Sequence, residues 1–131
     1  MRYLLAIYGD ESQRDAMTPE DGIAMMSAYD AYTQEVERAG VMLGGDGLQA
    51  SSTATTVRVR DNERLITDGP FAETREQLAG YYLLECADLD EAVRWAGKVP
   101  SAAMGSVEVR PVITYEDRVA RAQAGGAKAH A

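Results

Sequence analysis

The stretch Thr67-Asp68-Gly69-Pro70-Phe71-Ala72 ends a β-like run and turns the chain sharply. Glycine allows a positive φ at position 69, and Pro70 fixes its own φ and keeps the residue before it out of the helical region. Such a turn holds the Asp68 carboxylate on a stiff support, as an acid or base in catalysis requires. The alternative is that Asp-Gly-Pro is turn chemistry alone, and the motif taken by itself favours that alternative.

The segments on both sides of this turn predict β-structure. Residues 54–60 alternate between apolar and polar side chains, as in a half-exposed strand, and residues 64–67 return as the partner strand of a hairpin. After the turn, residues 78–86 predict a longer central strand. Residues 2–8 and the alternating segment 107–110 predict two more strands.

Two helices are predicted between these strands. Thr18 is a good N-cap, Pro19 suits the first helical position, and apolar residues then recur at helical spacing until Gly40 ends the helix. Asp88 caps a second helix, with Glu91 at the capping-box position. The order strand, helix, three strands, helix, strand is a split βαβ arrangement with an added hairpin. Because two helices on one face leave the other face of the sheet bare, we expect a second copy to bury it.

Length and composition describe one globular domain. The chain has 131 residues, of which 46% are hydrophobic and 26% charged. Residues 1–117 contain 10 basic and 21 acidic side chains, and this negative charge disfavours nucleic-acid binding. No segment has the length of a membrane span and no signal peptide fits, which predicts a cytoplasmic protein. The alanine- and glycine-rich end predicts a domain over residues 1–116 and a flexible tail over 117–131.

The single cysteine and the single histidine restrict the possible chemistry. Cys86 cannot form an internal disulfide and follows apolar residues, so we expect a small buried side chain and not a catalytic thiol. His130 is the penultimate residue, which excludes a Ser-His-Asp triad within the folded part of the chain. Neither metal-ligand spacing nor a dinucleotide-binding glycine motif occurs, so we expect no metal and no other cofactor.

Four further side chains are candidates for a site. Tyr8, at the end of the first strand, is the second catalytic candidate, because its hydroxyl can orient a substrate; an aromatic residue at the core edge is the equally expected alternative. Asp46 lies in the glycine-rich segment 44–47, which predicts a flexible loop close to a ligand. Tyr81 and Tyr82 point to opposite faces of one strand, so one lines the bare face and the other packs under a helix.

Three cations are candidates for binding an anionic substrate, although a solvated surface is the favoured alternative for each of them: Arg58, Arg60 and Arg75.

Several separated blocks resemble the DGPF branch of the YCII-related proteins. They occupy residues 1–10, 44–49, 68–84, 88–92 and 105–112, so the resemblance covers roughly residues 1–116. It implies a ferredoxin-like α+β fold with an antiparallel sheet that dimerises as an α+β barrel. Members of the wider family are proposed to use a His–Asp pair in a cleft, and a relative is a dehydrochlorinase acting on a chlorinated hydroxyquinol. This chain departs from that pattern because its only histidine is His130.

Two functions stay open. The first is a cofactor-independent acid–base enzyme of the lyase or isomerase type, in which Asp68 moves a proton on a small polar or aromatic substrate and Tyr8 orients it. The second is a non-catalytic homodimeric module that binds a small molecule or a protein. Some similar proteins are encoded beside, or fused to, extracytoplasmic-function sigma factors, which implies a regulatory partner. A closed polar pocket containing Asp68 would favour the enzyme.

Overall fold

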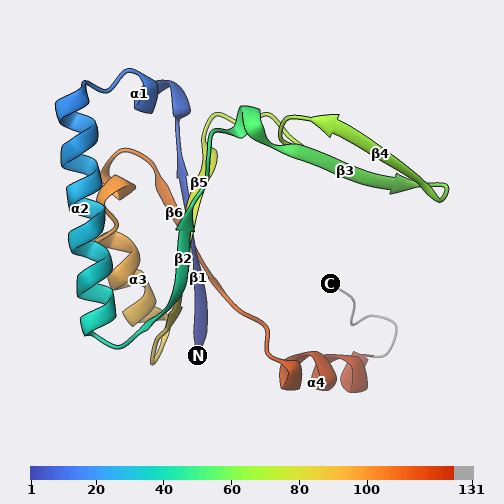
Figure 1. The fold of residues 1–131 in the computed structure, drawn as a ribbon. Coiled ribbons are helices and arrows are strands. Elements are labelled where there is room, and N and C mark those ends of the chain that lie inside the picture. Colours follow the sequence, from blue (N-terminus) through green and yellow to red (C-terminus); the bar gives the residue numbers. More distant parts are fainter. Residues whose placement is uncertain (126–131) are drawn as a thin grey trace.

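The computed structural model describes residues 1–125 and has a four-stranded antiparallel sheet with two helices packed on one face (Figure 1). The strands are β1 (Arg2–Gly9), β2 (Met42–Gly47), β5 (Gln77–Glu85) and β6 (Ser106–Pro111), in the order β2-β5-β1-β6. Helices α2 (Pro19–Arg38) and α3 (Leu89–Gly97) cover the sheet from the same side. The predicted ferredoxin-like α+β fold is confirmed.

Both helices begin where the sequence predicts. The Thr18 hydroxyl accepts a hydrogen bond from Asp21 N at 3.1 Å, and Gly40, with a φ of +76°, follows the end of α2. At α3, Asp88 Oδ1 accepts from Glu91 N at 2.9 Å, and the Glu91 carboxylate reaches back to Ala87 N at 2.7 Å. These caps satisfy backbone N–H groups that have no partner within the helices.

The core fills the space between the sheet and the two helices. Buried side chains alternate along β1 and β5 and meet apolar residues of α2 and α3. The Tyr32 hydroxyl donates to the carbonyl of Trp95 at 2.9 Å and so joins α2 to α3. Cys86 is buried in this core as predicted, and desolvation raises the pKa of its thiol, which keeps the thiol protonated.

The glycine-rich segment 44–47 differs from the expectation of a flexible loop, because it belongs to β2. Gly45 pairs with Tyr82 across the ladder, and a Cβ at this position would lie 2.8 Å from both the Tyr82 ring and the Tyr81 carbonyl oxygen. Glycine is therefore required by close packing and not by a turn. A short helix, α1 (Glu11–Asp15), was also not predicted; it follows β1 directly.

The predicted hairpin is confirmed as a separate two-stranded sheet of β3 (Thr55–Arg60) and β4 (Glu63–Asp68). Both turn residues have positive φ, +52° at Asp61 and +64° at Asn62, as a tight hairpin turn requires. A single helical turn, η1 (Ser51–Thr53), precedes it. In Figure 1 the hairpin extends away from the body on the side opposite α2 and α3.

The C-terminal part contains η2 (Pro100–Ala103) and a further helix, α4 (Tyr115–Gly125). Residues 117–125, expected to belong to a flexible tail, are helical instead. The start signal lies outside the alanine-rich stretch: Thr114 Oγ1 accepts from Asp117 N at 3.0 Å, and Asp117 Oδ2 accepts from Thr114 N at 3.2 Å. The rest of the predicted tail, including His130, lies outside the described residues. None of the helices within residues 1–125 has the length and apolar character needed to cross a membrane.

Candidate functional site

A pocket of about 390 Å³ lies between α2 and the edge of the sheet where β1 and β2 end. These two strands run parallel to each other because each is antiparallel to β5 between them, so their C-terminal ends share one edge. Glycines form part of the wall of this pocket. The lining glycines are Gly9, Gly45, Gly47, Gly80 and Gly105.

Methionines form much of the apolar wall. Four of the six methionines of the chain line the pocket: Met17, Met25, Met42 and Met104. The thioether side chain is flexible and polarizable, and it contacts aromatic rings favourably. This part of the wall is therefore apolar and adaptable in shape.

Two pairs of hydroxyl groups add polarity to the side of the pocket. The Thr33 and Tyr82 hydroxyls lie 2.8 Å apart, and those of Tyr29 and Ser101 lie 2.5 Å apart. Burial raises the pKa of the Tyr82 phenol, so it stays protonated and can donate a hydrogen bond at neutral pH. Tyr82 is therefore the member of the Tyr81–Tyr82 pair that packs under a helix.

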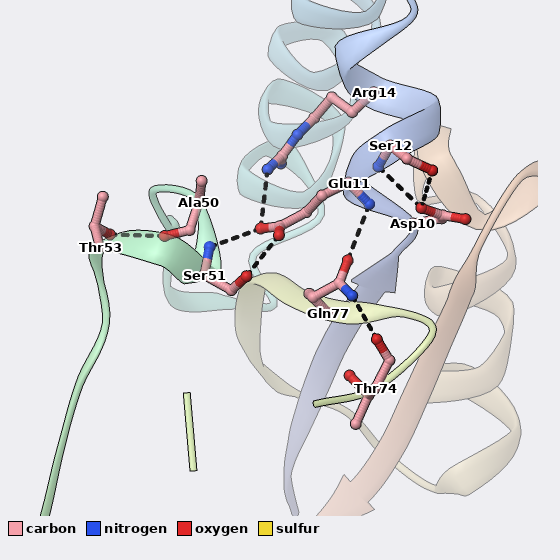
Figure 2. A network of polar contacts seen from close by, with 9 residues as sticks. All are labelled: Asp10, Glu11, Ser12, Arg14, Ala50, Ser51, Thr53, Thr74 and Gln77. Atoms are coloured by element: carbon pink, nitrogen blue, oxygen red, sulfur yellow. Dashed lines mark hydrogen bonds and ion pairs between the residues drawn. The ribbon is translucent and has the colours of Figure 1, made fainter. Parts of the chain in front are cut away.

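A network of polar contacts ties α1 to η1 and to the chain after β4 (Figure 2). The Glu11 carboxylate accepts from Ser51 N at 2.7 Å and from Ser51 Oγ at 2.6 Å, and Arg14 lies 3.6 Å from it. Gln77 bridges to the other side: its Oε1 accepts from Glu11 N at 3.0 Å and its Nε2 donates to the carbonyl of Thr74 at 2.6 Å. The Ser51 hydroxyl holds the pKa of Glu11 below its usual value.

Asp10 joins the same network from the end of β1. Its Oδ1 atom accepts from Ser12 N at 2.9 Å and from Ser12 Oγ at 2.6 Å, which caps α1. Both bonds lower the pKa of Asp10, and the bond from the Ser12 hydroxyl has the larger effect, so the carboxyl group is ionised at neutral pH. Asp10, Glu11 and Arg14 all line the pocket, so the network fixes charged groups at its wall.

The face of the sheet away from the helices carries a second polar group of residues. Across the ladder, Asp46, Tyr81, Ala6 and Glu108 stand opposite one another in one row. The Tyr81 hydroxyl donates to Asp46 Oδ2 at 3.0 Å, and this bond raises the pKa of the Tyr81 phenol. On the last strand, Arg110 lies 2.5 Å from Glu108.

The structure brings four of the predicted site residues to the pocket. Tyr8, Asp46, Tyr81 and Tyr82 are among its lining residues, although the side chains of Asp46 and Tyr81 lie on the sheet face away from the helices and bond each other there. Sequence reasoning did not find the methionines, Thr33 or Asp10, since methionines and threonines spaced along a helix are typical of an ordinary core.

Asp68 and Arg58 are not among the lining residues. Asp68 is exposed at the end of β4, and Gly69 after it has the positive φ that the sequence predicts, +97°; the Gly69 N–H donates to the carbonyl of Ala54 at 2.7 Å. Arg58 donates to the carbonyl of Phe71 at 3.4 Å from the hairpin. Arg60 and Arg75 lie outside the lining as well.

Within residues 1–125, no group of three or more histidine, cysteine or carboxylate side chains is placed to hold a metal ion. The chemistry that the pocket itself offers is hydrogen bonding, apolar contact and negative charge.

Comparison with known proteins agrees with this fold. An uncharacterized protein of Rhizobium meliloti (strain 1021) is 38% identical over 118 residues, which cover 88% of this chain and 95% of the relative. The family described as the YCII-related domain matches residues 1–116. With a match over that much of its length, the chain belongs to the YCII-related family.

Proposed function

We propose that this protein binds a small, ring-containing and largely apolar molecule in the pocket between α2 and the sheet. The observation that carries the proposal is the pocket itself, whose volume of about 390 Å³ falls within the range of small-molecule sites. Its methionine wall suits a ring, and a few fixed polar groups orient a substituent, which is the usual composition of such sites.

The hydroxyl groups define how a ligand would be oriented. The Thr33 and Tyr82 hydroxyls already share one hydrogen bond at 2.8 Å, and each keeps further capacity as donor or acceptor. A ligand whose ring lies against Met25 and Met42 would therefore present a hydroxyl or carbonyl group to this pair.

A pocket-filling substitution tests the proposal. Met25→Trp places a large ring in the pocket, so we expect the affinity for neutral ring molecules such as indole and 2-phenylethanol to fall at least about tenfold, measured by isothermal titration calorimetry. In wild type, a ligand at about 100 times its Kd adds roughly 2.7 kcal/mol to the free energy of unfolding, which thermal shift also detects.

The neighbouring residue provides the matched control. Met26 lies on the same helix, is 65% exposed and does not line the pocket, so Met26→Trp should leave the affinity unchanged. Equal affinities in wild type and Met25→Trp, or no binding of any ring molecule to wild type at millimolar concentration, would contradict the proposal.

A second candidate is the acid–base enzyme that uses Asp68, which requires a partner to enclose the exposed carboxylate, and the hairpin offers a surface for such a partner. On one face of the hairpin, Val57 and Ile66 stand opposite each other beside Val59, with exposed fractions of 55%, 58% and 61%, and Asp68 lies at the end of the same face. An isolated two-stranded hairpin is only marginally stable, and an exposed apolar face of this kind is typical of an interaction surface. We propose that a second copy of the chain packs against this face in a homodimer and that this copy also desolvates Asp68.

The mass in solution tests the homodimer. We expect light scattering to give twice the chain mass for wild type, and Val59→Asp to shift the protein toward the monomer without changing its circular dichroism. A monomeric wild type would overturn both the dimer and an Asp68 site that depends on it. In that case the exposed hairpin face would favour a different protein partner, as the sigma-factor connection implies.

A further inference from the structure

We infer that the ligand of the pocket is an uncharged ring that carries a hydrogen-bond acceptor at each of two opposite ends. The inference rests on the proposed function, because it assigns the polar chemistry of the ligand in the same pocket. It is carried by the two hydroxyl pairs of the wall, Thr33 with Tyr82 and Tyr29 with Ser101, and by the hydroxyl hydrogens that these pairs leave without an acceptor.

Each pair has one hydroxyl hydrogen more than it uses. A hydroxyl group has one hydrogen to donate, and two hydroxyls that bond to each other use only one of their two hydrogens. Within residues 1–125, none of the four hydroxyls has a further hydrogen-bond partner on the protein. Whichever member donates to the other, each pair therefore keeps one O–H group that is free to donate to a ligand.

All four hydroxyls lie on the side of the sheet that α2 covers, as the pocket does. Tyr82 belongs to the core between the sheet and the helices, and its hydroxyl meets Thr33 of α2. Tyr29 packs against the same core, and its hydroxyl meets Ser101 of η2. Both bonds are partly buried, so water has less access to the free O–H groups than at an exposed surface. A donor left without an acceptor in such surroundings is costly, which favours a ligand that supplies one.

The two pairs mark two separate points of the wall. Tyr29 and Thr33 are four positions apart on α2, so they lie on one face of the helix in successive turns, with roughly 5–6 Å between their Cβ atoms. Their partners belong to different elements, η2 and β5. A single acceptor atom therefore meets only one pair, whereas acceptors on opposite sides of a ring can meet both.

The same surroundings favour an uncharged ligand. Burial raises the pKa of the Tyr82 phenol, because surroundings that exclude water penalise negative charge. Among residues 1–125, Arg14 is the only cation that lines the pocket, and it lies 3.6 Å from the Glu11 carboxylate, so it is already paired. An ammonium group brings only donors, which leaves the free O–H groups without an acceptor.

Three probes of nearly the same shape test the two acceptors. They are 4-acetylpyridine, which has an acceptor at each end of the ring, and acetophenone and 4-ethylpyridine, which each keep one of the two. Their affinities for the wild-type full chain are measured by calorimetry at pH 8, where all three are uncharged. We expect 4-acetylpyridine to bind at least about fivefold more tightly than either of the others, the change in Kd expected for one neutral hydrogen bond.

Removal of one hydroxyl pair at a time completes the test. Both members of a pair must be replaced, because either hydroxyl alone would still have a hydrogen to donate. We expect Tyr29→Phe with Ser101→Ala to bind 4-acetylpyridine only as tightly as acetophenone. The affinity for acetophenone should be kept, since its single acceptor still meets the remaining pair, and this also shows that the variant is folded. Thr33→Val with Tyr82→Phe should give the same result from the other pair.

The matched control also removes two hydroxyls, neither of them in the pocket. The Tyr32 hydroxyl already donates to the carbonyl of Trp95, and Ser27 is exposed on α2; neither Tyr32 nor Ser27 lines the pocket. Tyr32→Phe with Ser27→Ala should therefore keep the full advantage of 4-acetylpyridine over acetophenone.

The outcomes distinguish this inference from the proposal on which it rests. If the three probes bind equally tightly, the acceptor inference is wrong while the pocket still binds ring molecules. An advantage of 4-acetylpyridine that persists in both pocket variants also overturns the inference, and so does its loss in the control variant. If none of the three probes binds at millimolar concentration, the proposed function itself fails.

Discussion

Replacing Leu5 by alanine is expected to lower the free energy of unfolding by about 2–5 kcal/mol, the usual cost of truncating a buried leucine. Leu5 lies in the middle of β1, has an exposed fraction of 0%, and stands between Tyr82 of β5 and Val109 of β6. Because its surroundings are held in place by strands on both sides, they cannot collapse into the cavity easily, which places the cost toward the upper part of that range. Urea unfolding followed by circular dichroism measures the change.

The same substitution at an exposed leucine serves as the control. Leu89, at the first position of α3, is 51% exposed, and Leu89→Ala should change the free energy of unfolding by less than about 0.5 kcal/mol. A similar decrease in the free energy of unfolding for Leu5→Ala and Leu89→Ala would mean that β1 is not at the centre of the core.

Gly105→Ala is expected to be the most damaging of the small changes near the pocket, with a loss of about 1–3 kcal/mol in the free energy of unfolding. A Cβ at Gly105 would lie 2.2 Å from the carbonyl oxygen of Tyr8 and 3.2 Å from the Cα of Gly9. Both atoms are backbone, so no rotamer change relieves the clash and β1 must move away from β6. Thermal unfolding of the variant gives the size of the effect.

Gly22→Ala is the matched control for this prediction. Gly22 lies within α2, and a Cβ added there would have open space for 4 Å around it beyond the helix's own backbone, so alanine meets no obstacle. Alanine is favoured over glycine in a helix interior by about 0.8–1.0 kcal/mol, and this variant should therefore be more stable than wild type. If Gly105→Ala were as stable as wild type, the close approach of β1 and β6 would be wrong.

Much of the fold could be predicted from local signals. Thr18 and Asp88 mark the starts of α2 and α3 because a capping side chain acts on backbone groups only a few positions away. The hairpin is equally local, since its two strands are joined by the short turn at Asp61 and Asn62. In each case the deciding interaction lies within a short stretch of sequence.

The errors come from contacts between distant parts of the chain. Gly45 is typical of a loop by its composition, and the glycine inside β2 is explained by Tyr81 and Tyr82, on a strand more than 30 residues further on. The pocket has the same origin, because it joins residues of β1, α2, β2 and η2 that have no common motif. Asp68 shows the reverse case: the positive φ of Gly69 could be predicted from the local motif, but that motif does not determine which surface the Asp68 carboxylate faces.

The central position of β1 has a consequence for how the protein is made. Arg2 pairs with Glu85 and Tyr3 with Pro111, so β1, which precedes the other strands in chain order, becomes an inner strand of the sheet. Its two neighbours, β5 and β6, begin only at Gln77 and Ser106 and are therefore synthesised well after it. The sheet therefore cannot form strand by strand during synthesis. Its long-range strand pairing slows folding, and the apolar residues of β1 stay unpaired until β5 and β6 are available.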